Sequence, residues 1–202
     1  MSAKLTSILS LPAGYRLFTR VVGGDVWRVH TQEYIKPREG EKVLDIGCGP
    51  ADILEYLPKV DYLGFDISQE YIDAARKRYG DRGRFFCSDV GLASIERERG
   101  TFDLVLATGV VHHLDDERAA SLFKLAKMAL SPKGRLVTYD GCYVPDQSRI
   151  ARWLLRNDRG KFVRTREAYE KLAGTVFHTI EPHLRHDMLR IPYTHLILRC
   201  SN

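Results

Sequence analysis

The sequence lacks the features that would place it in a membrane, on a disulfide scaffold or among zinc-binding proteins. No apolar run approaches the roughly 18–20 residues that a membrane-spanning helix requires. Zinc-ligand spacing is absent, and a chain of 202 residues does not need a disulfide framework. We therefore expect reduced thiols, packed as small apolar groups in a reducing cytoplasm, at all four cysteines: Cys48, Cys87, Cys142 and Cys200.

The sequence also lacks internal repeats and low-complexity segments. Its length can bury the core of one domain, and its 44% hydrophobic and 28% charged residues are ordinary for a globular protein. Before Glu41 the pattern predicts a helical extension over about residues 4–36, with breaks at Gly14 and at Gly23–Gly24.

The net charge of +5 is unevenly spread. Residues 149–166 hold a basic cluster with a single acid, Asp158, so the rest of the chain is nearly neutral. Ile150, Trp153 and Leu154 there have the spacing of an apolar face on an arginine-bearing helix. The seven members of the cluster are Arg149, Arg152, Arg156, Arg159, Lys161, Arg164 and Arg166.

Short apolar runs alternate with amphipathic stretches from Glu41 onward. This alternation predicts a parallel sheet with helices on both faces, because buried parallel strands have nearly continuous apolar sequences. The predicted strands are 42–47, 61–66, 84–89, 102–109 and 135–140. The predicted helices are 51–57, 69–80 and 115–130, with a turn at Pro132 and Gly134 before the fifth strand.

The C-terminal part has a different pattern. Residues 175–182 and 193–200 are both typical of strands, and no helix separates them. We expect them to form a hairpin at the edge of the sheet, with one strand antiparallel to the rest. The fold class is therefore α/β: a doubly wound, Rossmann-like sheet of seven strands, mostly parallel, with a C-terminal antiparallel hairpin.

The segment with the clearest chemical meaning is Val43-Leu44-Asp45-Ile46-Gly47-Cys48-Gly49-Pro50. A glycine-rich turn at the carboxyl end of a strand lets a ligand approach the backbone. Nicotinamide and flavin enzymes share such a turn, but three details argue against a dinucleotide. The third glycine position is Asp52, its carboxylate would repel a pyrophosphate, and Asp45 suits a ligand that carries an ammonium group.

These residues resemble the first motif of class I S-adenosylmethionine-dependent methyltransferases. Four further segments resemble later motifs of that family, so the resemblance covers residues 41–140. They are Asp66-Ile67, Ser88-Asp89-Val90, Phe102-Asp103-Leu104-Val105 and Leu130-Ser131-Pro132-Lys133-Gly134.

The resemblance implies S-adenosylmethionine as cofactor, with S-adenosylhomocysteine as product. It implies that Asp66 accepts hydrogen bonds from both ribose hydroxyls, that Ile67 packs on adenine, and that Asp89 takes the adenine amino group. Asp103 lies early in its strand, away from the ligand end, and we assign it a structural role. The full predicted cofactor set is Asp45, Gly47, Gly49, Asp66, Ile67, Asp89, Val90, Ala107 and Thr108.

The acceptor should lie above the carboxyl ends of the fourth and fifth strands, beside residues 108–113 and Tyr139-Asp140. Methyl transfer needs a base only where the acceptor must lose a proton, as a hydroxyl does. His112 and His113 are the candidate catalytic residues, since an unperturbed imidazole pKa of about 6.5 suits neutral pH. The alternative is that they cap the next helix or pack on the cofactor. We predict no metal site.

The resemblance also implies a domain layout and an acceptor class. Residues 1–40 are expected to form an extension over the site, and 41–202 the methyltransferase domain, with 141–176 as a segment that covers the substrate. The basic cluster is either a solvated face, a site for an anionic small molecule, or an RNA contact. We expect O- or N-methylation of a small acceptor, no nucleic-acid partner and no membrane span. The alternatives are an RNA methyltransferase and a catalytically silent S-adenosylmethionine-binding protein, and the oligomeric state stays open.

Overall fold

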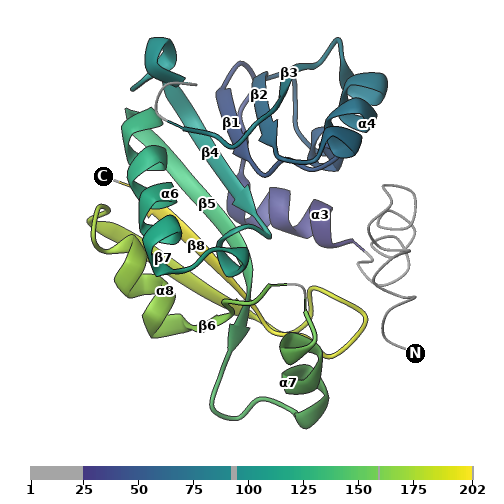
Figure 1. Ribbon diagram of the computed structural model, residues 1–202, viewed down its shortest axis with the longest axis vertical. Coiled ribbons are helices and arrows are strands. Elements are labelled where there is room, and N and C mark those ends of the chain that lie inside the picture. The colour runs from purple at the N-terminus through teal and green to yellow at the C-terminus, as the bar shows by residue number, and fades with distance from the viewer. Residues whose placement is uncertain (1–24, 92–94, 159, 202) are drawn as a thin grey trace.

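The computed structural model describes residues 25–91, 95–158 and 160–201 (Figure 1). Its strands are β1 (Lys42–Ile46), β2 (Asp61–Asp66), β3 (Gly83–Cys87), β4 (Phe102–Thr108), β5 (Leu130–Tyr143), β6 (Arg164–Thr165), β7 (Thr179–Arg185) and β8 (His195–Ser201). Its α-helices are α3 (Val26–Val29), α4 (Gln69–Tyr79), α6 (Asp116–Ala129), α7 (Arg149–Arg156) and α8 (Arg166–Ala173). Short 3₁₀ turns cover Asp52–Glu55, Glu96–Glu98 and Val111–His113, and a π-helix covers His30–Ile35.

One sheet with strand order β3-β2-β1-β4-β5-β8-β7 forms the centre of the molecule, and β6 pairs with the end of β5. The ladders from β3 to β5 are parallel, whereas β8 runs antiparallel to both of its neighbours, β5 and β7. The predicted fold class and the single antiparallel strand of the hairpin are therefore confirmed.

Apolar clusters cover the two faces of the sheet. On one face, α6 and α8 bury side chains such as Phe123 and Tyr169 against β4, β5 and β8. On the other face, α4 and the segment 26–35 pack on β1 and β2 through Ile72 and Ile35. Each long helix begins at a side-chain cap, for example Ser68 for α4 and Asp115 for α6. Within the described residues, no helix combines the length and the apolar character needed to cross a bilayer.

Several sequence-based boundaries differ from the structure. The helix predicted at 51–57 is one 3₁₀ turn, because Ala51 adopts a left-handed conformation (φ +57°) and Pro58 disfavours helix just before it. The turn predicted at Pro132 and Gly134 lies within β5, where the ladder with β4 shifts register. The first strand of the hairpin starts at Thr179 rather than 175, because the preceding residues continue the end of α8 with turn hydrogen bonds.

Two predicted packing assignments also need correction. Cys87 is exposed, whereas the other three cysteines are buried as expected. Helix α7 is present, but it buries Ala151 and Leu155, while Ile150 and Trp153 face solvent. The part of the N-terminal extension that is described, residues 26–35, is helical. Its predicted breaks at Gly14 and Gly23–Gly24 lie outside the described residues.

Candidate active site

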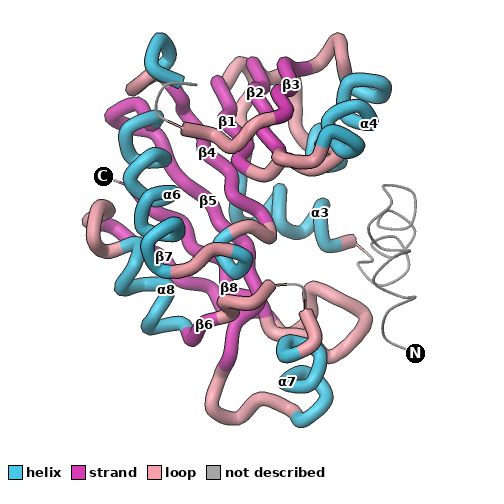
Figure 2. Tube along the Cα trace, viewed as in Figure 1, coloured by secondary structure: helices cyan, strands magenta, loops and turns pink. Residues whose placement is uncertain are grey.

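Most of the residues predicted to bind cofactor lie at one edge of the sheet, where the parallel strands end (Figure 2). The register shows this directly. Asp45 in β1 is opposite Leu106 in β4, Asp66 in β2 is opposite Cys87 in β3, and Thr108 ends β4 beside Tyr139 in β5. The structure therefore brings together, along this edge, the segments that the sequence motifs singled out.

The glycine-rich turn follows β1 directly. Gly47 (φ +70°) and Gly49 (φ +55°) both adopt left-handed conformations that favour glycine. A Cβ on Gly47 would lie 2.5 Å from the Val110 side chain, whereas a Cβ on Gly49 would meet nothing within 4 Å. Gly47 must therefore be small for packing, and Gly49 borders open space that a ligand can enter.

Asp66 is held in place by backbone donors from two elements. Its Oδ2 accepts a hydrogen bond from Gly49 N at 2.9 Å, and its Oδ1 accepts one from Ser68 N at 2.8 Å. Each carboxylate oxygen has a second lone pair, so two further donors can bind. Ile67 follows it with 80% of its surface exposed. An oriented acid beside an exposed apolar side chain fits a ribose with an attached base.

The remaining cofactor candidates lie at the ends of the neighbouring strands. Asp89 is exposed and Val90 is half-buried, both just after β3. Ala107 is buried in β4, and Thr108 at its end is half-buried. Asp103 lies at the opposite end of β4, where it accepts a hydrogen bond from Lys42 N, in agreement with the structural role expected for it.

Asp45 is more deeply buried than its motif suggests. Its Oδ2 accepts a hydrogen bond from the Tyr62 hydroxyl at 2.6 Å, while its Oδ1 is buried without a partner among the described residues. Burial raises the pKa of Asp45 to about 7, although the Tyr62 hydrogen bond works against this shift. An unsatisfied carboxylate oxygen at this position can accept a hydrogen bond from a ligand ammonium group.

His112 lies beyond the end of β4, between two carboxylates. Its Nδ1 is 2.8 Å from Asp140 Oδ1, and its Nε2 is 3.6 Å from Asp158 Oδ1. Burial disfavours the charged imidazole, but the interactions with Asp140 and Asp158 outweigh burial and raise the pKa of His112 to about 9. This value differs from the ordinary imidazole pKa assumed from the sequence. His113, by contrast, is exposed.

The segment 157–162 folds back over His112. Phe162 N donates to His112 O at 2.9 Å, and any Cβ on Gly160 would collide with the His112 ring. Asp158 accepts hydrogen bonds from Gly160 N and from the Tyr193 hydroxyl. Burial raises the pKa of Asp158, but these donors and His112 together hold it well below its ordinary value.

The sequence did not single out Asp158, Gly160 or Tyr193 as members of the site. Asp158 appeared there only as the lone acid of the basic cluster. The adjacent His112-His113 pair was the one signal near them, since a buried histidine needs partners.

A second group of buried rings lies at the same end of the sheet. Tyr139 lies between His30 and His195. Its ring centroid is 5.0 Å from that of His30 and 4.4 Å from that of His195. Burial lowers the pKa of each of these histidines to about 3, so both are neutral. Both ring nitrogens of His30 and Nδ1 of His195 are buried without hydrogen-bond partners among the described residues. These atoms are additional candidate contacts for an acceptor.

The basic cluster does not form one continuous surface. Arg164 is nearly buried and donates to Val111 O and Leu114 O, while Arg166 pairs with Glu170. Arg149 and Arg156 are exposed on α7. Arg159 lies outside the described residues. Within the described part of the chain, no cluster of three or more histidine, cysteine or acidic residues could hold a metal ion.

These observations test whether the edge fits S-adenosylmethionine. The open space at Gly49 suits close approach of a ligand to the backbone, and the oriented Asp66 with the exposed Ile67 suits a nucleoside. The unpartnered oxygen of Asp45 suits an ammonium group. The residues present therefore fit the nucleoside and amino-acid parts of this cofactor.

Comparison with known proteins gives one family match and several relatives. Residues 43–134 match a family described as "Methyltransferase domain". A malonyl-[acyl-carrier protein] O-methyltransferase from Legionella pneumophila is 32% identical over 105 residues, covering 49% of this chain and 32% of that protein. A ubiquinone biosynthesis O-methyltransferase from a Chelativorans species is 30% identical over 150 residues, covering 69% of this chain and 59% of that protein. The chain thus spans less than two thirds of the length of these relatives.

A solved structure gives the same picture for the fold. Phosphoethanolamine N-methyltransferase 2 from Haemonchus contortus, determined with phosphomonomethylethanolamine and S-adenosylhomocysteine, superimposes with a TM-score of 0.74 at 15% identity. The match covers all of this chain and 59% of that one. At this identity the likeness establishes the fold alone.

Proposed function

The chain belongs to the class I S-adenosylmethionine-dependent methyltransferases, and we propose that it methylates a hydroxyl or amine of a small acceptor by in-line displacement. When bound, S-adenosylmethionine supplies a methyl group on a positively charged sulfur, and S-adenosylhomocysteine is the product. The chain itself must align the acceptor with that methyl group, because proximity and orientation supply most of the acceleration for such a displacement.

The proposal of a small acceptor is carried by one observation, the return of segment 157–162 onto His112. The hydrogen bonds from Phe162 N to His112 O and from Tyr193 to Asp158 close a wall beyond the ends of β4 and β5. A wall at this place keeps water from the reacting atoms and leaves less room for a polymer than an open trough would.

Within this wall, His112 is the candidate catalytic residue. Held between Asp140 and Asp158, its imidazole carries a proton at neutral pH. It can act as a base toward a hydroxyl only after losing that proton and exchanging Asp158 for the acceptor at Nε2. With an amine acceptor no base is required, and His112 would serve to hold segment 157–162 in place.

An anionic acceptor is the finer part of the proposal, and it depends on Arg149, Arg152 and Arg156 of α7. Arg164 and Arg166 are engaged elsewhere, whereas Arg149 and Arg156 are exposed and Arg152 gives one of its donors to Val144 O. Replacement of all three by glutamine should then raise the KM for the acceptor and leave cofactor affinity unchanged.

The acceptor class can be tested without knowing the acceptor. The protein is incubated with methyl-labelled S-adenosylmethionine and a cell extract, which dialysis divides into small molecules and macromolecules and phenol extraction then divides into RNA and protein. We expect label in small-molecule products other than the cofactor itself, and none with Asp66→Ala at the same protein concentration. Labelling of RNA or protein alone would contradict a small acceptor, and binding of S-adenosylmethionine without labelling of any fraction would favour a silent binding protein.

A further inference from the structure

Helix α7 presents three stripes along its eight residues. Ala151 and Leu155, four residues apart, are buried against the body of the protein. Ile150, Trp153 and Leu154 share a second side by their i, i+3 and i+4 spacing, and Arg149, Arg152 and Arg156 share a third by i, i+3 and i+7. We call the second and third stripes together the α7 outer face.

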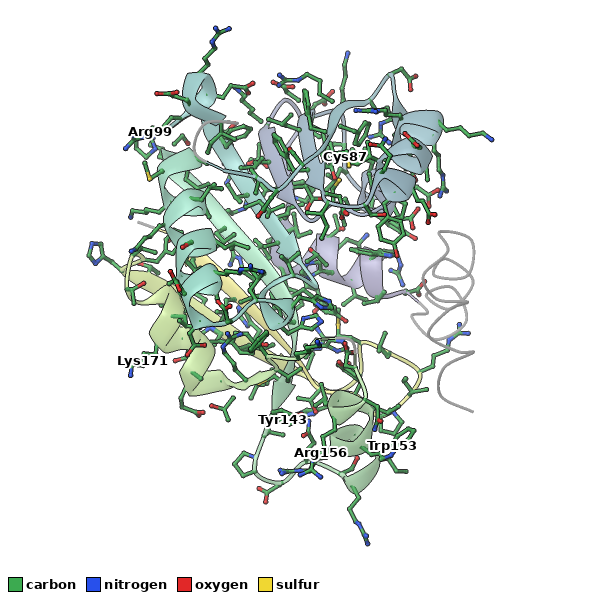
Figure 3. The ribbon with its side chains drawn as sticks, in the orientation of Figure 1. Cys87, Arg99, Tyr143, Trp153, Arg156 and Lys171 are labelled. Carbon is green, nitrogen blue, oxygen red and sulfur yellow. The ribbon has the colours of Figure 1, made fainter. Side chains whose placement is uncertain are left out.

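The apolar part of the α7 outer face is open to solvent. Ile150 is 60% exposed and Trp153 is 62% exposed, which makes them two of the most exposed large apolar side chains among the described residues. Figure 3 shows Trp153 and Arg156 at the end of the molecule beyond the strands, turned away from the sheet. Neither side chain is needed for the packing of the helix, because Ala151 and Leu155 provide that contact.

We propose that the α7 outer face docks onto an anionic lipid surface. A tryptophan and an aliphatic side chain next to a stripe of arginines is the pattern of a helix that lies in the membrane interface, with its apolar side inserted and its cations at the headgroups. Two other occupants of this face are residues 1–24 of the same chain and a second copy of the chain, and charge disfavours both. Residues 1–24 contain Lys4, Arg16 and Arg20 and no acid, so they would be repelled by the arginine stripe. A second copy of the chain, with a net charge of +5, is also disfavoured.

The docking is expected to be reversible, since one short helix inserts little apolar area. It involves the same α7 arginines as the proposed anionic acceptor, but its test follows vesicle binding and does not depend on methyl transfer. It would hold the site near acceptors that enter from a membrane surface.

Trp153 provides the probe for the test. The chain has two tryptophans, Trp27 and Trp153, so Trp27→Phe leaves Trp153 as the only indole. This protein is mixed with phosphatidylcholine vesicles with or without phosphatidylglycerol, and binding is followed by Trp153 emission and by co-sedimentation. We expect a blue shift and sedimentation only with phosphatidylglycerol, both weakened at high salt.

Two double variants separate the apolar contribution to vesicle binding from the contribution of the arginines. Ile150→Ser with Trp153→Ser, followed by sedimentation, should lose binding although the arginines remain. Arg149→Gln with Arg156→Gln should weaken binding about 25-fold, because each cation near an anionic surface contributes about fivefold. Arg99→Gln with Lys171→Gln removes the same charge from exposed positions elsewhere (Figure 3) and should change binding by less than about threefold.

Several outcomes would overturn the proposal. Equal binding to both vesicle types, or none to either, would exclude an anionic lipid surface. Trp153 emission that is already blue-shifted and protected from iodide without vesicles would show that the chain itself covers this face. Binding to soluble polyglutamate that matches the vesicles and survives loss of Ile150 and Trp153 would point to an acidic protein instead.

Discussion

The proposed cofactor side and the proposed acceptor side of the site are built in different ways. On the cofactor side, from β1 to β4, backbone groups set the geometry: the positive φ angles of Gly47 and Gly49, and the backbone donors that orient Asp66. On the acceptor side, side chains set it, through the contacts of His112 with Asp140 and Asp158.

The difference has an electrostatic consequence. The acceptor side concentrates charge, with the pKa of His112 raised to about 9 and that of Asp158 held well below its ordinary value. Because a backbone turn is a local feature and a side-chain network is not, substitutions should separate cofactor binding from the remaining functions of the site.

The largest expected effect is on turnover. With a hydroxyl acceptor, His112→Ala should lower kcat/KM by about 10²–10⁴, the usual contribution of a general base. In the wild type kcat/KM should rise with pH through about 9, because the imidazole must first lose its proton. Steady-state kinetics between neutral and alkaline pH would measure both.

His113 provides the matched control for the His112→Ala variant. His113 is exposed, so His113→Ala should change kcat/KM by less than about threefold. An effect of His113→Ala as large as that of His112→Ala, or full activity in both variants with a hydroxyl acceptor, would remove histidine from the chemistry. Tyr139 and Asp140 would then be the next candidates.

The next largest effect should fall on cofactor affinity alone. On the role proposed for Asp66, Asp66→Ala would remove an acceptor of two ribose hydrogen bonds, each worth about 1.5–3 kcal/mol when charge-assisted, so binding should weaken by at least about a hundredfold. Calorimetric titration with S-adenosylhomocysteine measures this. Asp158→Asn, in the other half of the site, should keep nearly wild-type affinity. A change under about threefold in a folded Asp66→Ala protein would contradict the ribose assignment.

The acceptor side should also make stability depend on pH in a defined window. Because the folded pKa of His112 is about 9 and the ordinary value is 6.5, its contribution is complete below about pH 6.5 and is lost as the pH rises through about 9. The shift corresponds to about 3 kcal/mol. Urea unfolding should show this loss in the wild type and much less of it in Asp140→Asn, which removes the negative charge beside Nδ1.

Asp140→Asn also separates the titration of His112 from that of other groups, since the remaining buried histidines are present in both proteins. An identical decline in the free energy of unfolding for both proteins between pH 6.5 and 9 would mean that Asp140 does not hold the proton on His112.

The same contrast explains what the sequence could predict. The strands from β1 to β4, the glycine turn and Asp66 were predictable because hydrophobic period and turn chemistry are local. The limits of the helix after the turn were missed because the left-handed Ala51 has no local signature.

The acceptor side was less accessible from sequence. The contact between His112 and Asp158 joins residues 46 positions apart, and the close approach of Gly160 becomes visible only when the chain has folded. Helix α7 was predicted, but its predicted packing face of Ile150, Trp153 and Leu154 is wrong, because periodicity cannot tell which of two apolar stripes is buried. Ala151 and Leu155 pack inward because small and aliphatic side chains fit against the sheet, and Trp153 stays outside.

The central claim, that the cofactor side binds S-adenosylmethionine, is tested most directly by thermal unfolding with added ligand. At about 100 times its dissociation constant, S-adenosylmethionine or S-adenosylhomocysteine should stabilise the protein by about 2.7 kcal/mol and raise Tm accordingly. NADH should leave Tm unchanged, since Asp52 occupies the third glycine position of a dinucleotide turn. Equal stabilisation by NADH, or no stabilisation by either sulfur ligand, would contradict the account.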